Sequence, residues 1–256
     1  MSAQNSSQIV AVIPARYESS RFPGKPLTPI AGRSMIQHVY ERVRQCRTIS
    51  RVVVATDDER ILKAVQDFGG EALMTRPDHR CGTERVAEVA SHLSAGIYVN
   101  VQGDEPLIDP QAVDSAVKAV ESDAEVNLAT LCVAIVRPSD IMDPNVVKVV
   151  NDFQGDALYF SRAPVPWVRE ESERVSAQHW KHIGVYVFRH DALLEYPTLP
   201  PGDLERLEQL EQLRWLENGY RMRVVESTYD AVSVDLPADV ARVEGLIRER
   251  AASTAN

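Results

Sequence analysis

Residues 9–27 read IVAVIPARYESSRFPGKPL, a short apolar run followed by a loop that is rich in proline and basic side chains. An apolar run of this length suits a strand that is buried on both faces of a parallel sheet. The loop carries Arg16, Arg21 and Lys25, and a glycine precedes the lysine. A triphosphate needs several cations and backbone N–H groups, and a loop at the end of a buried strand can supply both. The segment therefore predicts an α/β sheet with a phosphate-binding loop after its first strand.

Two widespread phosphate-binding motifs are absent from this loop. It contains neither the GxxxxGK[ST] of P-loop enzymes nor the GxGxxG of dinucleotide-binding enzymes. An NAD-dependent oxidoreductase is therefore disfavoured, although it would share the sheet architecture. A solvated basic loop without a ligand stays open as the interpretation of this loop taken alone.

Strands and amphipathic helices alternate through the first half of the chain. Further buried strands are predicted at residues 51–57, 72–74 and 97–101, and helical stretches with apolar residues at i, i+3, i+4 and i+7 lie between them. This alternation predicts a Rossmann-like, doubly wound, mostly parallel sheet. Ligands bind such sheets at the carboxyl ends of the strands, near the point where the strand order reverses. The loops that leave these carboxyl ends are therefore the predicted site.

The pattern changes after about residue 127. Short strand-like stretches, separated by turns that contain proline and aspartate, predict a smaller mixed or antiparallel insertion at about residues 135–225. Leucine at every third position predicts a long helix over residues 204–217. Residues 231–240 suggest a last strand that leads into a C-terminal helix with Pro237 in its first turn.

The domain organisation expected from these patterns is simple. Residues 1–8 are polar and predicted to be disordered, and residues 9–250 are predicted to form one α/β domain with the insertion inside it.

Composition excludes several classes of partner. The formal charge is −9, from 28 Lys and Arg against 37 Asp and Glu, which disfavours non-specific binding to nucleic acid or to an anionic membrane. Cys46, Cys81 and Cys132 are far apart and form no CxxC pair, which suits a reducing compartment. With neither a signal-peptide pattern nor an apolar run of about 20 residues, a cytoplasmic protein is expected.

Four segments carry a resemblance to a known family. They are RYESSRFPGKPL (16–27), RPDHRCGTERVAEV (76–89), VNVQGDEPLI (99–108) and LEQLRWLENG (210–219). Together they resemble the 3-deoxy-manno-octulosonate (Kdo) cytidylyltransferases, and the resemblance extends from about residue 9 to about residue 247.

The resemblance implies a fold of the nucleotide-diphospho-sugar transferase type, with a single nucleotidyltransferase domain. It also implies the reaction: the anomeric hydroxyl of Kdo attacks the α-phosphorus of CTP, and CMP-Kdo and pyrophosphate are formed. A homodimer and a role in lipopolysaccharide biosynthesis follow from the same resemblance.

The CTP-binding residues implied by the resemblance lie in two segments. Arg16, Ser19, Arg21 and Lys25 would hold the phosphates, and Lys25 is the candidate for stabilising charge at the α-phosphate. The catalytic residues expected are Lys25, Arg16 and Asp104. The residues expected to bind the nucleotide through its base are Arg76, Gly82 and Thr83. Cys81 departs from the serine that the family commonly carries, and a thiol is a poorer hydrogen-bonding partner for the base.

Asp104 and Asp235 are the metal ligands that the resemblance implies, with Mg²⁺, two ions being expected, as the cofactor. Mg²⁺ prefers carboxylate and phosphate oxygens and takes much of its shell from substrate and water. Without the resemblance, Asp104 also suits a turn and Asp235 a helix N-cap.

Kdo brings a carboxylate and many hydroxyls, and six residues correspond to the family's sugar-binding positions. They are Gln102, Arg162, His182, Tyr186, Glu211 and Gln212. Arg162 would pair with the sugar carboxylate through a charge-assisted bond. The two aromatic residues of this set, which point to one face of a strand, also suit a core.

Two other functions stay open at this point. A CMP-sugar synthetase for a related acidic sugar, such as sialic acid or 8-amino-Kdo, would need only a few different pocket residues. A nucleotide-binding protein without catalysis is disfavoured, because Lys25, Asp104 and Asp235 are all present.

Overall fold

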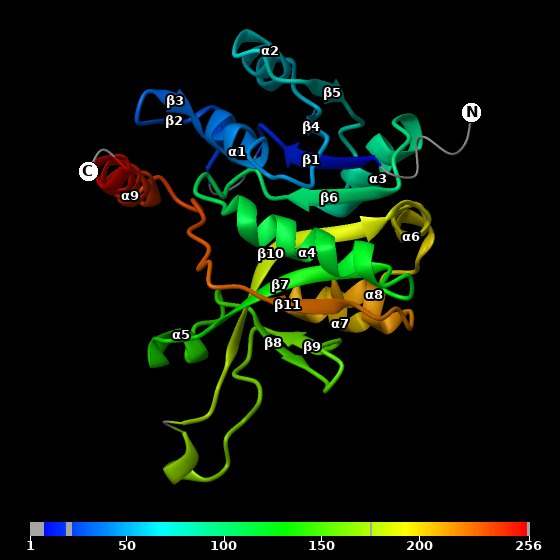
Figure 1. Cartoon of the computed structure of the whole chain (residues 1–256), viewed down its shortest axis with the longest axis vertical. Coiled ribbons are helices and arrows are strands. Elements are labelled where there is room, and N and C mark those ends of the chain that lie inside the picture. Colours follow the sequence, from blue (N-terminus) through cyan, green and yellow to red (C-terminus); the bar gives the residue numbers. More distant parts are fainter. Residues whose placement is uncertain (1–7, 19–21, 175, 255–256) are drawn as a thin grey trace.

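The computed structural model describes residues 8–18, 22–174 and 176–254. Its main sheet has the strand order β11-β7-β10-β6-β1-β4-β5, and β8 and β9 continue it beside β10 (Figure 1). The strands of this sheet are β1 (Ile9–Ala15), β4 (Arg51–Thr56), β5 (Ala72–Met74), β6 (Ile97–Val101), β7 (Leu128–Ala134), β8 (Lys148–Asn151), β9 (Ala157–Ser161), β10 (Trp180–Arg189) and β11 (Arg223–Glu226). A separate small hairpin consists of β2 (Pro29–Ile30) and β3 (Arg33–Ser34).

The strand order reverses at β1, which pairs in parallel with β4 on one side and with β6 on the other. β10 is antiparallel to both of its neighbours β6 and β7, and β7 pairs in parallel with β11. The sheet is therefore mostly parallel, and the predicted fold class is confirmed. Because β1 and β6 are adjacent and parallel, the loops that leave their carboxyl ends lie side by side.

Helices cover both faces of this sheet (Figure 1). They are α1 (Met35–Val43), α2 (Glu59–Asp67), α3 (Gly82–His92), α4 (Pro110–Ser122), α5 (Pro138–Met142), α6 (His190–Glu195), α7 (Asp203–Glu208), α8 (Leu213–Glu217) and α9 (Asp239–Thr254), with 3-10 turns at η1 (Lys25–Leu27), η2 (Glu171–Glu173) and η3 (Tyr196–Thr198). β1 shows why the layers form: Ile9, Ala11 and Ile13 join the core under α1, α2 and α4, whereas Val10 and Val12 join the core under α3, α6 and α8. A strand buried on both faces needs this continuous apolar run.

The prediction of one helix over residues 204–217 is wrong. The chain forms two short helices, α7 and α8, and Gln209 between them has a φ of 53°. The predicted strand within residues 231–240 is also wrong, because this stretch is irregular up to α9. Pro237 precedes α9 instead of lying in its first turn, and its carbonyl accepts from Val240 N.

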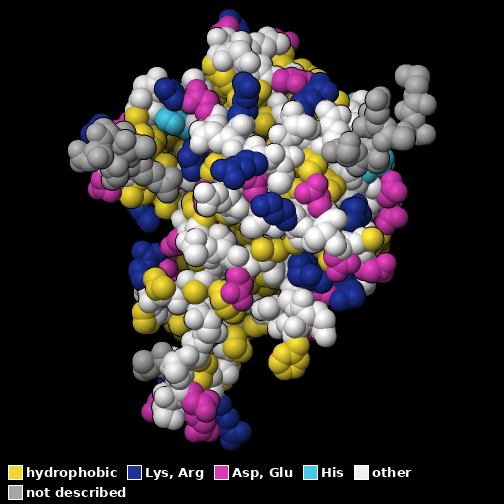
Figure 2. Space-filling view, in the orientation of Figure 1, with side chains coloured by type: hydrophobic (Ala, Val, Ile, Leu, Met, Phe, Trp, Pro, Cys, Tyr) yellow, Lys and Arg dark blue, Asp and Glu magenta, His cyan; other side chains and the backbone are white. Residues whose placement is uncertain are grey.

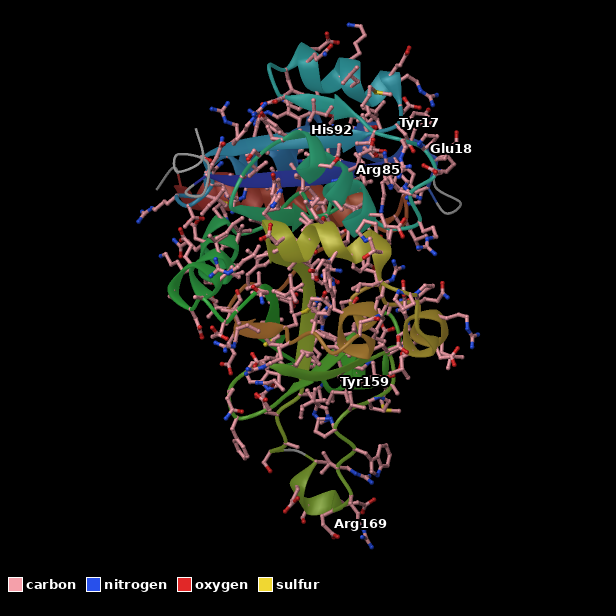
Figure 3. The ribbon with its side chains drawn as sticks, turned by 90° about the vertical axis from the view of Figure 1, so that its right-hand side faces the viewer. Tyr17, Glu18, Arg85, His92, Tyr159 and Arg169 are labelled. Carbon is pink, nitrogen blue, oxygen red and sulfur yellow. The ribbon has the colours of Figure 1, made fainter. Side chains whose placement is uncertain are left out.

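The second half of the chain divides between the sheet and a projection. β7 and β10 extend the central sheet, whereas β8 and β9 form an antiparallel extension below it (Figure 1). The segment between β9 and β10 projects from the body, with Arg169 at its tip, far from Tyr17 and Glu18 after β1 (Figure 3). Acidic and basic side chains are interspersed over the face seen in Figure 2. Among the described residues, no helix combines the length and apolar character that crossing a membrane requires.

Candidate active site

Lys25 lies in the turn η1, at the end of the loop that follows β1. Gly24 precedes it in the left-handed region, with a φ of 71°, and a side chain at that position would meet the Tyr17 ring at 3.2 Å. This glycine permits the turn that directs Lys25 back toward the sheet. The Lys25 ammonium donates to Asp104 Oδ2 at 2.6 Å and to the carbonyl of Val234 at 3.0 Å.

Asp104 follows β6, and its backbone carbonyl is hydrogen-bonded to the C-terminal segment. Val234 N donates to the carbonyl of Asp104 at 3.0 Å, and the Val234 side chain is buried in a small core with Met35 and Leu107. Asp235 is therefore placed beside the Lys25–Asp104 pair, although 131 positions separate it from Asp104 in the chain (235 − 104). The structure therefore brings Lys25 and Asp104 together and places the backbone next to Asp235 beside them.

A cavity of about 310 Å³ opens next to this cluster, and five of the six predicted sugar-binding residues line it. They are Gln102, His182, Tyr186, Glu211 and Gln212. A second cavity of about 490 Å³, which Asp235 and Asp239 line, adjoins the first. The two share Lys181 and Ser233 among their lining residues, so they form neighbouring parts of one cleft.

The break between α7 and α8 directs two of these side chains into the cleft. Gln212 accepts from the Tyr186 hydroxyl at 3.1 Å, and its Nε2 is buried without a hydrogen-bond partner. Glu211 Oε2 accepts from Thr83 N at 3.2 Å, at the start of α3. A buried donor is normally hydrogen-bonded in proteins, so this amide is available to a polar ligand or to water in the cleft.

Glu105 also lines the cavity, although it is not among the predicted site residues. The side chain is 6% exposed, and Oε2 has no hydrogen-bond partner. Burial and, to a smaller extent, the neighbouring Asp104 raise the pKa of Glu105 to about 8, although Lys181 opposes the shift. The cavity therefore contains a carboxyl group that is largely protonated at neutral pH.

Arg162 does not lie where the resemblance placed it. It does not line the cavity. Its guanidinium donates to three carbonyl groups, those of Glu208 at 2.7 Å, Pro144 at 2.9 Å and Gln209 at 3.4 Å. These bonds tie the end of β9 to α7. The basic side chain that lines the cavity is that of Lys181, which sequence reasoning missed.

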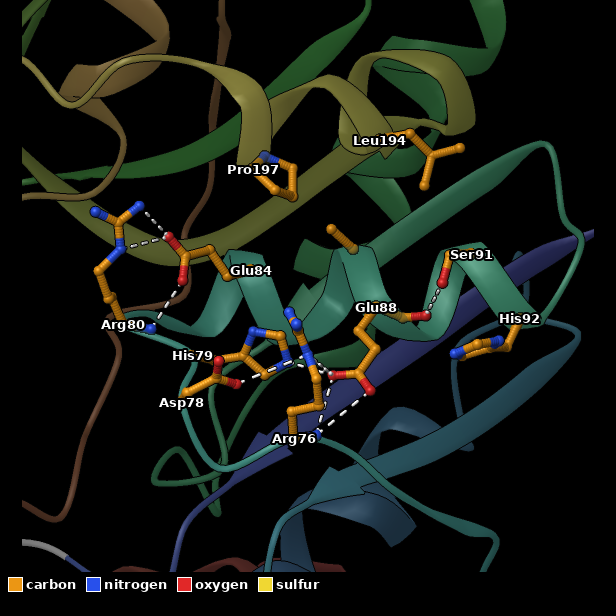
Figure 4. Close-up of a pocket in the computed structure, with 11 residues that line it drawn as sticks. Arg76, Asp78, His79, Arg80, Glu84, Glu88, Ser91, His92, Leu194 and Pro197 are labelled. Atoms are coloured by element: carbon orange, nitrogen blue, oxygen red, sulfur yellow. Dashed lines mark hydrogen bonds and ion pairs between the residues drawn. The ribbon is translucent and has the colours of Figure 1, made fainter.

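The three predicted base-contacting residues are not brought together. A side chain at Gly82 would meet Pro14 at 3.4 Å and Asn100 at 3.5 Å, so Gly82 faces the carboxyl ends of β1 and β6. Thr83 is buried beside it. Arg76 instead lies exposed near Glu88, on the outer side of α3, where it lines a separate cavity of about 550 Å³ (Figure 4).

His79 lies in the loop before α3. Its ring is buried and pairs with Glu88 (Figure 4). The carbonyl of His79 accepts from the Arg16 guanidinium, so the loop after β1 and the loop before α3 are joined. Ser19 and Arg21, two of the predicted phosphate ligands, lie outside the described residues.

Cys81 is the N-cap residue of α3, although its side chain makes no capping hydrogen bond, and its Sγ lies 3.6 Å from the Tyr196 hydroxyl. Burial raises the pKa of the thiol, and the nearby Glu211 raises it further. The thiol is therefore neutral and a weak nucleophile.

His182 is neutral in the folded chain. The Thr130 hydroxyl donates to the carbonyl of Val185 at 2.8 Å and lies 2.9 Å from His182 Nε2. Because that hydroxyl proton is used, Nε2 carries the ring proton and donates to Thr130, and Nδ1 is the acceptor. Burial lowers the pKa of His182 to about 3.

We expect the wild-type chain to lose more stability on acidification than the His182→Gln variant does. Between pH 6.5 and 3 the unfolded chain binds a proton at His182 that the folded chain does not bind, so acidification favours unfolding. The difference should reach at most about 1.4 kcal/mol per pH unit. Urea unfolding of both proteins at pH 6.5 and pH 5 measures it, and equal losses would contradict the buried neutral histidine.

Comparison with known proteins agrees with this geometry. The family model described as "Cytidylyltransferase" matches residues 10–226. The 3-deoxy-manno-octulosonate cytidylyltransferase of Solibacter usitatus is 53% identical over 241 residues, which make up 94% of this chain and 95% of that protein. The protein of the same name from Geobacter sulfurreducens is 50% identical over 243 residues, 92% of this chain and 97% of that protein.

Solved structures show the same similarity. A CMP:2-keto-3-deoxy-manno-octonic acid synthetase in complex with CTP is 46% identical and superimposes with a TM-score of 0.91, over 95% of this chain and 100% of that one. A putative glucose-1-phosphate thymidylyltransferase from Bacillus anthracis has a TM-score of 0.67 at 16% identity, over 94% of this chain and 95% of that one. The second structure is similar in fold alone.

Proposed function

This chain belongs to the 3-deoxy-manno-octulosonate cytidylyltransferase family, and from that membership we propose that it transfers CMP from CTP to the anomeric hydroxyl of Kdo. The anomeric oxygen forms a bond to the α-phosphorus, the bond to the bridging oxygen breaks, and pyrophosphate leaves. One observation carries the proposal: Lys25, Asp104 and the segment of Asp235 meet, and the adjoining residues Glu105 and Ser233 line a cavity with polar side chains.

Lys25 has the position that charge stabilisation requires. Phosphoryl transfer depends mainly on positioning and on neutralising oxygen charge. The Lys25 ammonium is held at a fixed place by Asp104 and by a carbonyl, so it is oriented before the α-phosphate approaches. Such preorganised charge is an effective source of catalysis.

Asp104 and Asp235 would hold Mg²⁺, and we infer two ions. Among the described residues no cluster of three His, Cys, Asp or Glu side chains is placed to bind a metal. Two carboxylates fit Mg²⁺, which usually takes one or two carboxylates and completes its shell with phosphate oxygens and water. When bound, the ions would neutralise charge on the attacking and leaving oxygens.

The cavity chemistry supports an acidic sugar with many hydroxyls. Gln102, Glu105, Glu211 and Gln212 offer hydrogen-bonding groups, and Lys181 offers a positive charge. The carboxyl oxygens of Glu105 and Glu211 would also accept hydrogen bonds from an ammonium group, so 8-amino-Kdo is the second candidate substrate. CMP-Kdo would supply lipopolysaccharide biosynthesis, and a cytoplasmic location belongs to the same proposal.

A homodimer is part of this proposal as well. The second half of the chain exposes large apolar residues. Among them are Leu158, Met142 and Trp167, whose exposed fractions are 62%, 64% and 67%. Surfaces of this kind suit contact with a second copy.

The substrate assay tests the proposed function directly. Pyrophosphate release would be followed with CTP and Mg²⁺ while Kdo, 8-amino-Kdo and sialic acid are offered separately. We expect the highest kcat/KM with Kdo. A higher value with 8-amino-Kdo or sialic acid would assign the other sugar, and release with none of the three would refute the function.

A further inference from the structure

Lys181 has a distinctive place among the side chains that line the sugar cavity. Glu105 and Glu211 line the same cavity, and His182 there is uncharged because burial lowers its pKa to about 3. Among the described lining residues, Lys181 is the one Lys or Arg side chain. An anionic ligand in this cavity would therefore have one cation to pair with.

Two hydrogen bonds hold the Lys181 ammonium and leave one of its N–H donors for a ligand. Lys181 Nζ donates to Asp230 Oδ1 at 2.7 Å and to the carbonyl of Ala231 at 3.0 Å. An ammonium has three N–H donors, so one remains for a ligand. The side chain of Asp230 is 53% exposed, and an exposed ion pair contributes little free energy. The carboxylate of a ligand can therefore compete with Asp230 for the Lys181 ammonium.

Lys181 also lies where the two parts of the cleft meet. It lines both the sugar cavity and the adjoining cavity of Asp235. The carboxylate of a 2-keto-3-deoxy sugar is attached to its anomeric carbon, so it must lie close to the hydroxyl that attacks the nucleotide. A cation at the junction is in the right place for that carboxylate, whereas Arg162 is not, because it lines neither of the two cavities.

We propose that the Lys181 ammonium binds the carboxylate of the acidic sugar and thereby sets the preference for acidic over neutral sugars. This proposal rests on the proposed function and goes beyond it, since it names the residue that recognises the charge. The interaction is a charge-assisted hydrogen bond, whose loss typically weakens binding about 10- to 100-fold.

The first experiment compares Lys181→Met, which keeps the aliphatic stem, with Lys181→Arg, which keeps the charge. We expect Lys181→Met to raise the KM for Kdo about 10- to 100-fold and to leave the KM for CTP within about 3-fold, and Lys181→Arg to recover most of the loss. Lys63→Met is the matched control, because Lys63 is exposed on α2 and pairs only with Asp67 in the structure. An unchanged KM for Kdo in Lys181→Met would overturn the proposal.

The second experiment changes the charge on the substrate. Kdo and its C1 carboxamide would be compared as substrates of wild type, Lys181→Met and Arg162→Met. Wild type should prefer the acid, and the preference should fall about 10-fold or more in Lys181→Met only. An equal preference in wild type and Lys181→Met, or its loss in Arg162→Met alone, overturns the assignment.

Two controls separate the outcomes. Calorimetric CTP binding shows that each variant is folded, and Lys181→Gln, which retains a donor for Ala231, replaces Lys181→Met if that variant binds no CTP. If wild type forms no CMP-sugar from Kdo, the proposed function fails. If wild type does so and the acid preference survives in Lys181→Met, only the role of Lys181 fails.

Discussion

Replacement of Lys25 by alanine is expected to lower kcat for pyrophosphate release at least about 100-fold, the effect of removing one well-placed electrostatic stabiliser. The ammonium lies between Asp104 Oδ2 and the carbonyl of Val234, so its position does not depend on a flexible surface conformation. The KM for CTP should change much less, because stabilisation that acts in the transition state appears in kcat.

Lys63→Ala provides the control for this variant, since it removes a lysine whose side chain is 74% exposed on α2. Its kcat should stay within about 2-fold of wild type, as expected of a surface substitution that touches no ligand. A kcat for Lys25→Ala within a few-fold of wild type would refute the role of Lys25 at the α-phosphate. A loss confined to the KM for CTP would reduce that role to ground-state binding.

The sheet could be predicted because its signal is local. β1 is buried on both faces over most of its length, so a continuous apolar run was enough to identify it. The membership of β10 could not be predicted in the same way. In its pairing with β6, Val185 lies opposite Val101. A local sequence pattern cannot predict a contact between two residues that are so far apart in the chain.

The false helix over residues 204–217 shows the limit of periodicity. Leucine at every third position indicates an apolar face but does not detect Gln209 in the left-handed region. Long-range contacts stabilise the break: Arg214 pairs with Glu205 across it at 2.6 Å and with Glu84 of α3 at 3.3 Å. The break also directs Gln212 to Tyr186. The local sequence pattern therefore failed to predict an element that lines the cavity.

The site was predicted by resemblance, and the structure qualifies it residue by residue. The meeting of Lys25 and Asp104 with the segment of Asp235 agrees with the expectation, and family membership is confirmed. Arg162 departs from it because its carbonyl partners come from two other segments of the chain. Lys181 precedes His182 in the sequence, and its charge was the signal that could have identified it.

Replacement of Asp104 or Asp235 by asparagine is expected to raise the Mg²⁺ concentration for half-maximal activity at least about 10-fold. Loss of a group that only orients a metal ligand typically costs 10- to 100-fold in metal affinity, and loss of a ligand should cost no less. Asparagine keeps the size of the side chain but not its charge, so the effect reports the carboxylate. Mg²⁺ titration of pyrophosphate release at saturating CTP and Kdo measures this concentration.

Asp109→Asn is the matched control, because it makes the same chemical change at the N-cap of α4. Asparagine also caps helices well, so this variant should keep the wild-type Mg²⁺ dependence. The two test positions need not respond equally. Asp104 also pairs with Lys25, so its loss should lower the maximal rate as well as metal affinity, whereas the loss at Asp235 should be recovered more fully by excess Mg²⁺. A wild-type titration curve for either variant would remove that aspartate from the metal site, and wild-type curves for both would leave the proposed Mg²⁺ ions without protein ligands.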